Sequence, residues 1–142
     1  MLDRRTFVAA GLAAAASCAS SSTTRPAAKK NLLILGGTGF LGPHQVRCAL
    51  ARGHRVTVFN RGRSGKGMFG PDVEELVGDR NGDLSALQGR SFDAVIDESA
   101  SQSNAPEWVQ RAAELLRDRT EQYLFVSTRA VYLDTAAVPM TT

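Results

Sequence analysis

Three glycines at a three-residue spacing, Gly36, Gly39 and Gly42, follow an apolar run over residues 32–35. In such an arrangement the first glycine permits a tight turn and the second lets backbone approach a phosphate closely. The third lets the following helix pack near the sheet. The N–H groups and the dipole of that helix favour a bound anion. The spacing therefore predicts a strand–turn–helix unit that holds the pyrophosphate of a dinucleotide.

The elements around the glycines support this prediction over an ordinary glycine-rich turn, which is the alternative. A helix is expected over residues 40–51, with Gly53 just beyond its C-terminus, and a second strand over residues 56–59. The residues of the turn that should contact the cofactor are Gly36, Thr38, Gly39, Phe40, Leu41 and Gly42.

The residues after the second strand bear on the choice of cofactor. In a unit of this kind, an acidic residue at the strand end binds the ribose of NAD, whereas an arginine accommodates the 2′-phosphate of NADP. Here Asn60 is followed by Arg61, with Arg63 and Lys66 nearby and no carboxylate. The sequence predicts that NADP is preferred and that NAD is the alternative cofactor. A solvated basic loop is the competing interpretation.

The remaining chain predicts further alternating strands and helices. Strands are expected over residues 74–77, 92–97 and 123–127, and an amphipathic helix over residues 105–119. Together with the first two strands they predict an α/β fold, a Rossmann-type doubly wound parallel sheet with about five strands.

Smaller features of these segments carry expectations of their own. Asp83 should be the N-cap of a single helical turn over residues 83–87. Asp97 and Glu98, at the carboxyl end of the fourth strand, should line the nicotinamide side of the site. Trp108 is expected to pack rather than to bind substrate.

The segments GGTGFLG, VTVFNRG, VGDRNGDLSAL and FVSTRAVY resemble, in order and spacing, the short-chain dehydrogenase/reductase superfamily. The closest resemblance is to its extended or atypical NAD(P)-dependent epimerase/dehydratase branch, over residues 31–132. It implies an NAD(P)-binding portion of an epimerase, dehydratase or reductase that transfers hydride on a sugar nucleotide or another carbonyl or hydroxyl substrate. It also implies that Asp79 lies at the adenine edge, with Arg80 beside it as a second contact.

The same resemblance bears on catalysis. It places the catalytic hydroxyl at Thr128, with Ser127 as the alternative, and a strand-end hydroxyl that caps backbone is the competing interpretation. The family moves its proton through a Tyr-x-x-x-Lys motif about twenty residues further on. No such motif occurs in these 142 residues, and Lys66 is the last lysine.

The missing motif and the small number of strands predict that residues 31–142 form a truncated NAD(P)-binding domain whose C-terminal part is missing. A non-catalytic dinucleotide-binding or redox-sensing module is therefore the alternative function.

The first thirty residues differ in character from the rest. Residues 1–22 join Arg4 and Arg5 to an alanine-rich stretch, which predicts a twin-arginine signal peptide, and residues 23–30 read as a linker. The stretch is too short for a stable membrane span. We expect an exported, periplasmic or otherwise extracytoplasmic protein, with Cys18 as a candidate site for a lipid anchor.

Charge and composition exclude several other functions. The first thirty residues hold five of the 17 basic residues and only one of the 14 acidic ones, which leaves 12 basic against 13 acidic residues. The expected domain therefore lacks the basic footprint of a nucleic-acid binder. Two cysteines and two histidines, without ligand spacing, predict no metal site. A small-molecule substrate is the expected partner, and an oligomer is compatible with the sequence.

Overall fold

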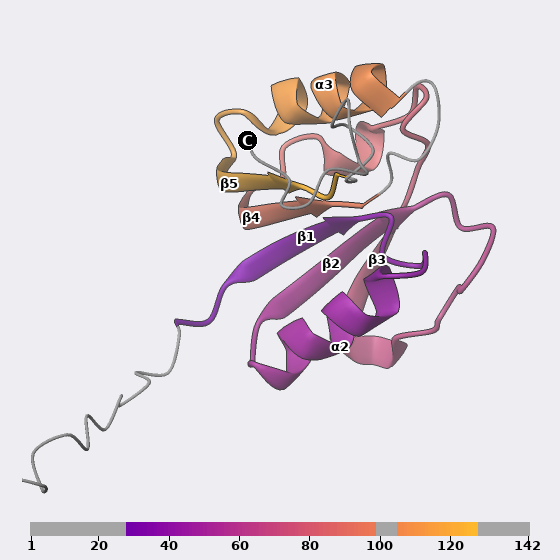
Figure 1. Cartoon of the computed structure of the whole chain (residues 1–142), viewed down its shortest axis with the longest axis vertical. Helices are drawn as coiled ribbons and strands as arrows, with labels where there is room; N and C mark the ends of the chain where they lie inside the picture. Colours follow the sequence, from indigo (N-terminus) through magenta and orange to yellow (C-terminus); the bar gives the residue numbers. More distant parts are fainter. Residues whose placement is uncertain (1–27, 99–104, 128–142) are drawn as a thin grey trace, which may run out of the picture.

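The computed structural model describes residues 28–98 and 105–127, and within them five strands form one parallel sheet in the order β3-β2-β1-β4-β5 (Figure 1). The strands are β1 (Asn31–Leu35), β2 (Arg55–Asn60), β3 (Val73–Val77), β4 (Phe92–Asp97) and β5 (Thr120–Phe125). This order places β1 between β2 and β4. The chain therefore reverses its direction of travel across the sheet at β1, as in a Rossmann fold.

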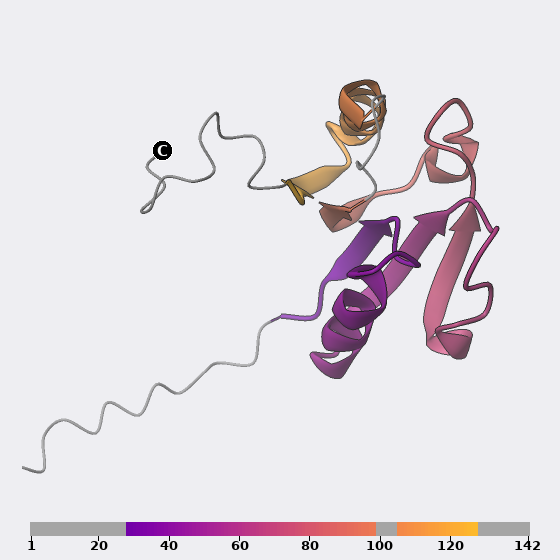
Figure 2. The ribbon, with the colours of Figure 1, turned by 45° about the vertical axis from the view of Figure 1, so that its right-hand side comes forward.

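Helices cover both faces of the sheet, as Figures 1 and 2 show. Helix α2 (Gly42–Ala51) packs on one face through Val46 and Ala49, and α3 (Ala105–Leu116) packs on the other through Ala112 and Leu116. Two short 3₁₀ helices, η1 (Gly70–Asp72) and η2 (Ser85–Leu87), lie in the connections before and after β3.

Alternation along the strands explains the two layers. On β1, Leu33 and Leu35 belong to the core beneath α3, whereas Leu32 and Ile34 belong to the core beneath α2. All four are buried, so the run reads as continuously apolar although its side chains alternate between faces. The expected α/β doubly wound parallel sheet is confirmed.

Three boundaries differ from the sequence prediction. Helix α2 begins at Gly42 rather than at residue 40, because the Gly39 N–H donates to the Gly36 carbonyl (2.9 Å) and keeps the residues before Gly42 in the turn. Helix α3 ends at Leu116 rather than at residue 119. Strand β5 begins three residues early, because its parallel pairing with β4 sets Thr120 opposite Phe92.

Candidate dinucleotide site

The glycine turn after β1 is tightened by close backbone contacts. Gly36 has a φ of 94°, which favours glycine, and its N–H donates to the Phe59 carbonyl of β2 at 3.0 Å. A Cβ on Gly42 would lie 2.2 Å from the Gly37 carbonyl oxygen. Gly42 is therefore required where helix α2 meets the turn itself.

The glycine that meets the sheet is Gly37, which the sequence analysis did not single out. Its Cβ would lie 2.8 Å from a methyl group of Val58 on β2. The expectation that Gly42 serves helix–sheet packing was therefore wrong in detail. The adjacent Gly-Gly pair was the signal that could have identified the second glycine.

The N-terminus of α2 presents its backbone without an internal counter-charge. Its N-cap, Leu41, has no side-chain acceptor, and the first turn contains no acidic residue. The first N–H groups of a helix lack intrahelical partners and carry partial positive charge, so this terminus suits an external anion.

A cleft of about 490 Å³ opens beside this turn, at the carboxyl ends of the strands. Its volume lies within the usual range for small-molecule sites, roughly 300–1,000 Å³. It is lined by Gly36, Thr38, Gly39, Phe40, Leu41, Phe59, Asn60, Arg61, Gly62, Arg63, Ser64, Gly78, Asp79, Arg80, Glu98 and Trp108. The structure thus brings together every residue that the sequence predicted for the cofactor except Gly42, which supports the turn from behind.

Asn60 ends β2 with a fixed side chain. Its Oδ1 accepts a hydrogen bond from the Gly62 N–H at 2.7 Å, which sets the orientation of the amide. Its Nδ2 is buried and has no hydrogen-bond partner. Since buried donors are almost always satisfied, this one fits a ligand that offers an oxygen acceptor, such as a ribose hydroxyl or a phosphate. Arg61 and Arg63 follow on the same side of the cleft, and both are exposed.

The loop after β3 positions Asp79. A Cβ on Gly78 would lie 2.6 Å from both the Phe59 ring and the Asp83 carbonyl, so only glycine fits there. Asp79 and Asp83 exchange backbone hydrogen bonds of 2.9 and 2.7 Å, which closes the loop. Asp83 accepts hydrogen bonds from the Ser85 N–H and hydroxyl, as its predicted capping role requires, and these bonds lower its pKa.

Arg80 and Asp97 form a buried ion pair, with Arg80 Nη1 donating to Asp97 Oδ1. The Tyr123 hydroxyl donates to Asp97 Oδ2 at 2.6 Å. Burial, followed by the hydrogen bond to Asp97, raises the pKa of Tyr123. The network joins the ends of β4 and β5 to the loop after β3.

This network corrects two expectations about the cleft. Asp97 was expected to line the nicotinamide side, but it is fully buried beneath the cleft. Arg80 does line the cleft, yet its guanidinium engages Asp97, so it is more than the free contact that was expected beside Asp79.

Glu98 is the acidic residue that reaches the cleft from β4. Its N–H donates to the Leu35 carbonyl at 3.0 Å, which places it beside Gly36. Its side chain is half-buried, and its Oε1 is buried without a hydrogen-bond partner. Burial, followed by the negative charge of Asp97, raises the pKa of Glu98 to about 7.

Trp108 of α3 also lines the cleft, contrary to the expectation that it only packs. Its Nε1 lies 3.4 Å from Asn81 Oδ1, and Arg111 Nη1 lies 3.4 Å from the Asn81 carbonyl. Helix α3 therefore holds the loop that carries Asp79. The sequence gave no signal for this, because the contacts join residues far apart in the chain.

The two candidates for the catalytic hydroxyl have different outcomes. Ser127 is exposed just beyond β5 and does not line the cleft, whereas Thr128 lies outside the described residues. Cys18 and the leader also lie outside them. Within residues 28–98 and 105–127, no cluster of His, Cys, Asp and Glu could hold a metal ion. No helix of that part of the chain is long and apolar enough to cross a membrane.

Comparison with known proteins gives three kinds of likeness. The model of the NAD dependent epimerase/dehydratase family matches residues 32–141. The chloroplast stem-loop binding protein of 41 kDa b from Arabidopsis thaliana is 32% identical over 123 residues, which are 76% of this chain and 32% of that protein.

Solved structures show the same fold. A UDP-galactose 4-epimerase is 26% identical, with a TM-score of 0.60 over 76% of this chain and 41% of that one. UDP-N-acetylglucosamine 4-epimerase from Methanobrevibacter ruminantium M1 is 19% identical, with a TM-score of 0.64 over 80% of this chain and 42% of that one. The chain thus spans about a third of the length of the curated relative and about two fifths of these two enzymes.

Proposed function

Because the chain belongs to the NAD dependent epimerase/dehydratase family, we propose that it is the cofactor-binding portion of an enzyme that prefers NADP. The enzyme would transfer hydride on a sugar nucleotide or another carbonyl or hydroxyl substrate. The epimerases of similar fold, whose names specify UDP-sugars, support this substrate class. The cleft at the carboxyl ends of the strands is the observation that carries the proposal.

The residues of the cleft divide the cofactor between them. The glycine turn and the N-terminus of α2 would hold the pyrophosphate. The unpartnered Asn60 Nδ2 would donate to the adenosine ribose or its phosphate, and Asp79 would lie at the adenine edge. When bound, the nicotinamide would supply the hydride chemistry of the reaction.

The preference for NADP depends on Arg61. This exposed guanidinium lines the cleft directly after Asn60, with Arg63 nearby, and no carboxylate follows β2 to accept from both ribose hydroxyls. A guanidinium presents a planar fork of donors that matches a phosphate.

Replacing Arg61 with Ala tests this preference. A charge-assisted hydrogen bond contributes roughly 1.5–3 kcal/mol, so NADPH affinity should fall at least tenfold while NADH affinity stays unchanged. Titration of nicotinamide fluorescence measures both. Arg55→Ala, at the exposed opposite end of β2, is the matched control and should change neither. Equal affinities for the two cofactors before and after the Arg61 change would refute the preference.

A non-catalytic dinucleotide-binding or redox-sensing module is the second candidate. It is favoured by the absence of any tyrosine followed four residues later by lysine in the 142 residues. Incubating the chain with oxidised cofactor and UDP-galactose distinguishes the two. Formation of an epimer, or of reduced nicotinamide, supports an enzyme, and tight cofactor binding without either supports the module.

The name of the chloroplast relative raises binding to nucleic-acid stem-loops as a third function. The balance of 12 basic and 13 acidic residues after the first thirty weighs against it, because phosphate contacts need a surplus of cations.

A further inference from the structure

Glu98 occupies an unusual place for a carboxylate. It lies one residue beyond β4, and the register of Leu35 with Asp97 sets it opposite Gly36, the first residue of the glycine turn. Both residues line the same cleft. The pyrophosphate assigned to this turn would therefore bring negative charge close to Glu98.

The charges around Glu98 do not neutralise it. Asp97, its neighbour on β4, is negative and fully buried. Arg80, from the loop after β3, and Tyr123, from β5, both engage Asp97. Asp79 adds another acidic group to the cleft, and the exposed cations Arg61 and Arg63 follow β2. The glycine turn contributes no charged side chain, and α3 contributes the uncharged Trp108.

The Oε1 atom of Glu98 gives a second, independent indication. It is buried without a hydrogen-bond partner. A buried carboxylate oxygen without a donor is costly, whereas a protonated carboxyl is neutral and can itself donate a hydrogen bond. Protonated Glu98 could therefore donate to an oxygen of the bound cofactor.

We propose that Glu98 must carry a proton for a dinucleotide to bind in the cleft, so that cofactor binding is coupled to proton uptake. This inference rests on the cofactor-binding function proposed above. It makes Glu98 a residue that tunes cofactor affinity with pH, in addition to the residues that hold the cofactor.

The pKa of about 7 sets the range and the sign of the effect. Below pH 7 most molecules have a neutral Glu98 and bind the anion. Above pH 7 the carboxylate forms and binding must first take up a proton, so affinity falls. By linkage, bound dinucleotide raises the pKa of Glu98 further.

The test is calorimetric titration of the 142-residue chain with adenosine diphosphoribose at pH 6 and pH 8. This probe carries the pyrophosphate but no 2′-phosphate, whose own titration near pH 6 would interfere. The unmodified chain should bind roughly tenfold more weakly at pH 8 than at pH 6, the change in the neutral fraction of a group with a pKa near 7.

Glu98→Gln keeps the shape and the donor but removes the titration. It should bind as tightly at pH 8 as at pH 6. Glu107→Gln, an exposed change on α3, is the matched control and should keep the fall seen in the unmodified chain. In the unmodified chain, titrations in buffers of different ionisation enthalpy should show uptake of up to one proton per ligand at pH 8.

Three outcomes overturn the inference while the proposed function stands. The fall with pH is absent, it persists unchanged in Glu98→Gln, or affinity instead rises with pH because the carboxylate accepts from the ligand's hydroxyls. A titration of carboxyl ¹³C signals, with Glu98 assigned by its loss in Glu98→Gln, gives a direct check. A midpoint near 4.5 in the free chain would also overturn it. Failure of every variant to bind adenosine diphosphoribose or NADPH at either pH would overturn both proposals.

Discussion

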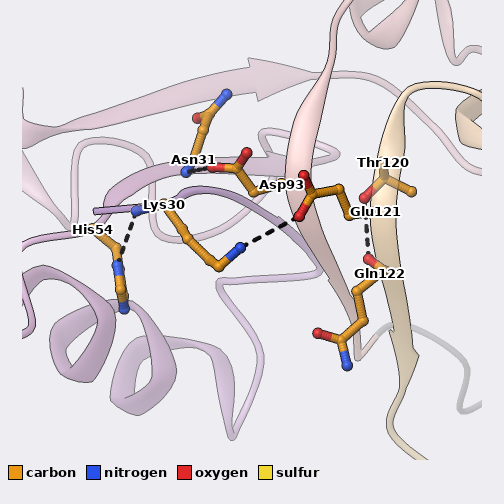
Figure 3. Close-up of polar contacts among 7 residues, drawn as sticks. All are labelled: Lys30, Asn31, His54, Asp93, Thr120, Glu121 and Gln122. Atoms are coloured by element: carbon orange, nitrogen blue, oxygen red, sulfur yellow. Dashed lines mark hydrogen bonds and ion pairs between the residues drawn. The ribbon is translucent and has the colours of Figure 1, made fainter. Parts of the chain in front are cut away.

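The two ends of the parallel sheet are formed by the same strands but treat their polar groups differently. At the carboxyl ends, a cleft contains a buried amide nitrogen on Asn60 and a buried carboxylate oxygen on Glu98 that have no hydrogen-bond partner. At the amino ends, side chains of the chain itself supply most of the partners, as Figure 3 shows.

The amino end illustrates ordinary closure. The Lys30 N–H donates to His54 Nδ1 at 3.2 Å, and the Asn31 N–H donates to Asp93 Oδ2 at 2.5 Å (Figure 3). Lys30 Nζ also pairs with Glu121 at 3.4 Å, but both side chains are largely exposed. Such a surface pair contributes about 0–1 kcal/mol to stability. Asn31 Oδ1 is the exception at this end, buried without a partner.

The difference teaches where the fold has left room for a ligand. Parallel strands direct the start of each following turn to their carboxyl ends, so the glycine turn, Asn60 and Glu98 converge there. The unpartnered polar atoms in that cleft are a cost of the free protein that a ligand can offset. The amino end offers no comparable cleft among the described residues.

The largest effect is expected from breaking the buried pair beneath the cleft. Asp97→Ala leaves Arg80 charged and buried, which should cost about 3–5 kcal/mol in the free energy of unfolding. Tyr123→Phe removes one hydrogen bond and should cost less, roughly 1–3 kcal/mol. Urea unfolding followed by circular dichroism measures both. A loss below that of Tyr123→Phe for the Asp97 change would contradict the comparison of a strained end with a closed one.

A smaller loss of stability, but a large loss of binding, is expected from Gly42→Ala. The new Cβ would overlap the Gly37 carbonyl, so the turn must shift at a cost of about 1–3 kcal/mol. NADPH binding should fall by more than tenfold, because the displaced turn carries the phosphate site. Gly82→Ala is the control, since a Cβ there meets nothing within 4 Å and φ is not positive. Unchanged NADPH affinity in Gly42→Ala would remove the turn from the site.

The glycine spacing and the apolar runs were sufficient to predict the sheet and most of the cleft. Both are local signals: the run from Leu32 to Leu35 identifies a buried strand, and the glycines that follow identify the turn. Asn60 and Arg61 could likewise be placed because they directly follow a strand.

Contacts between distant segments could not be predicted in the same way. Arg80, Asp97 and Tyr123 come from three separate segments, and only the pairing of β4 with β5 brings the last two together. Trp108 reached the cleft for the same reason, through α3 and the loop at Asn81. An amphipathic pattern indicates which face of a helix is apolar, but it does not indicate which loop that helix contacts.

The most direct test of the central claim is to map NADPH binding on the backbone amides of the ¹⁵N-labelled chain. The account predicts shift changes concentrated in residues 36–42, 60–64, 78–80 and 98, at the carboxyl end of the sheet. The amides of Lys30, Asn31, His54, Asp93 and Glu121 at the amino end should stay unchanged. Changes centred on the amino end, or no change at saturating NADPH, would contradict it.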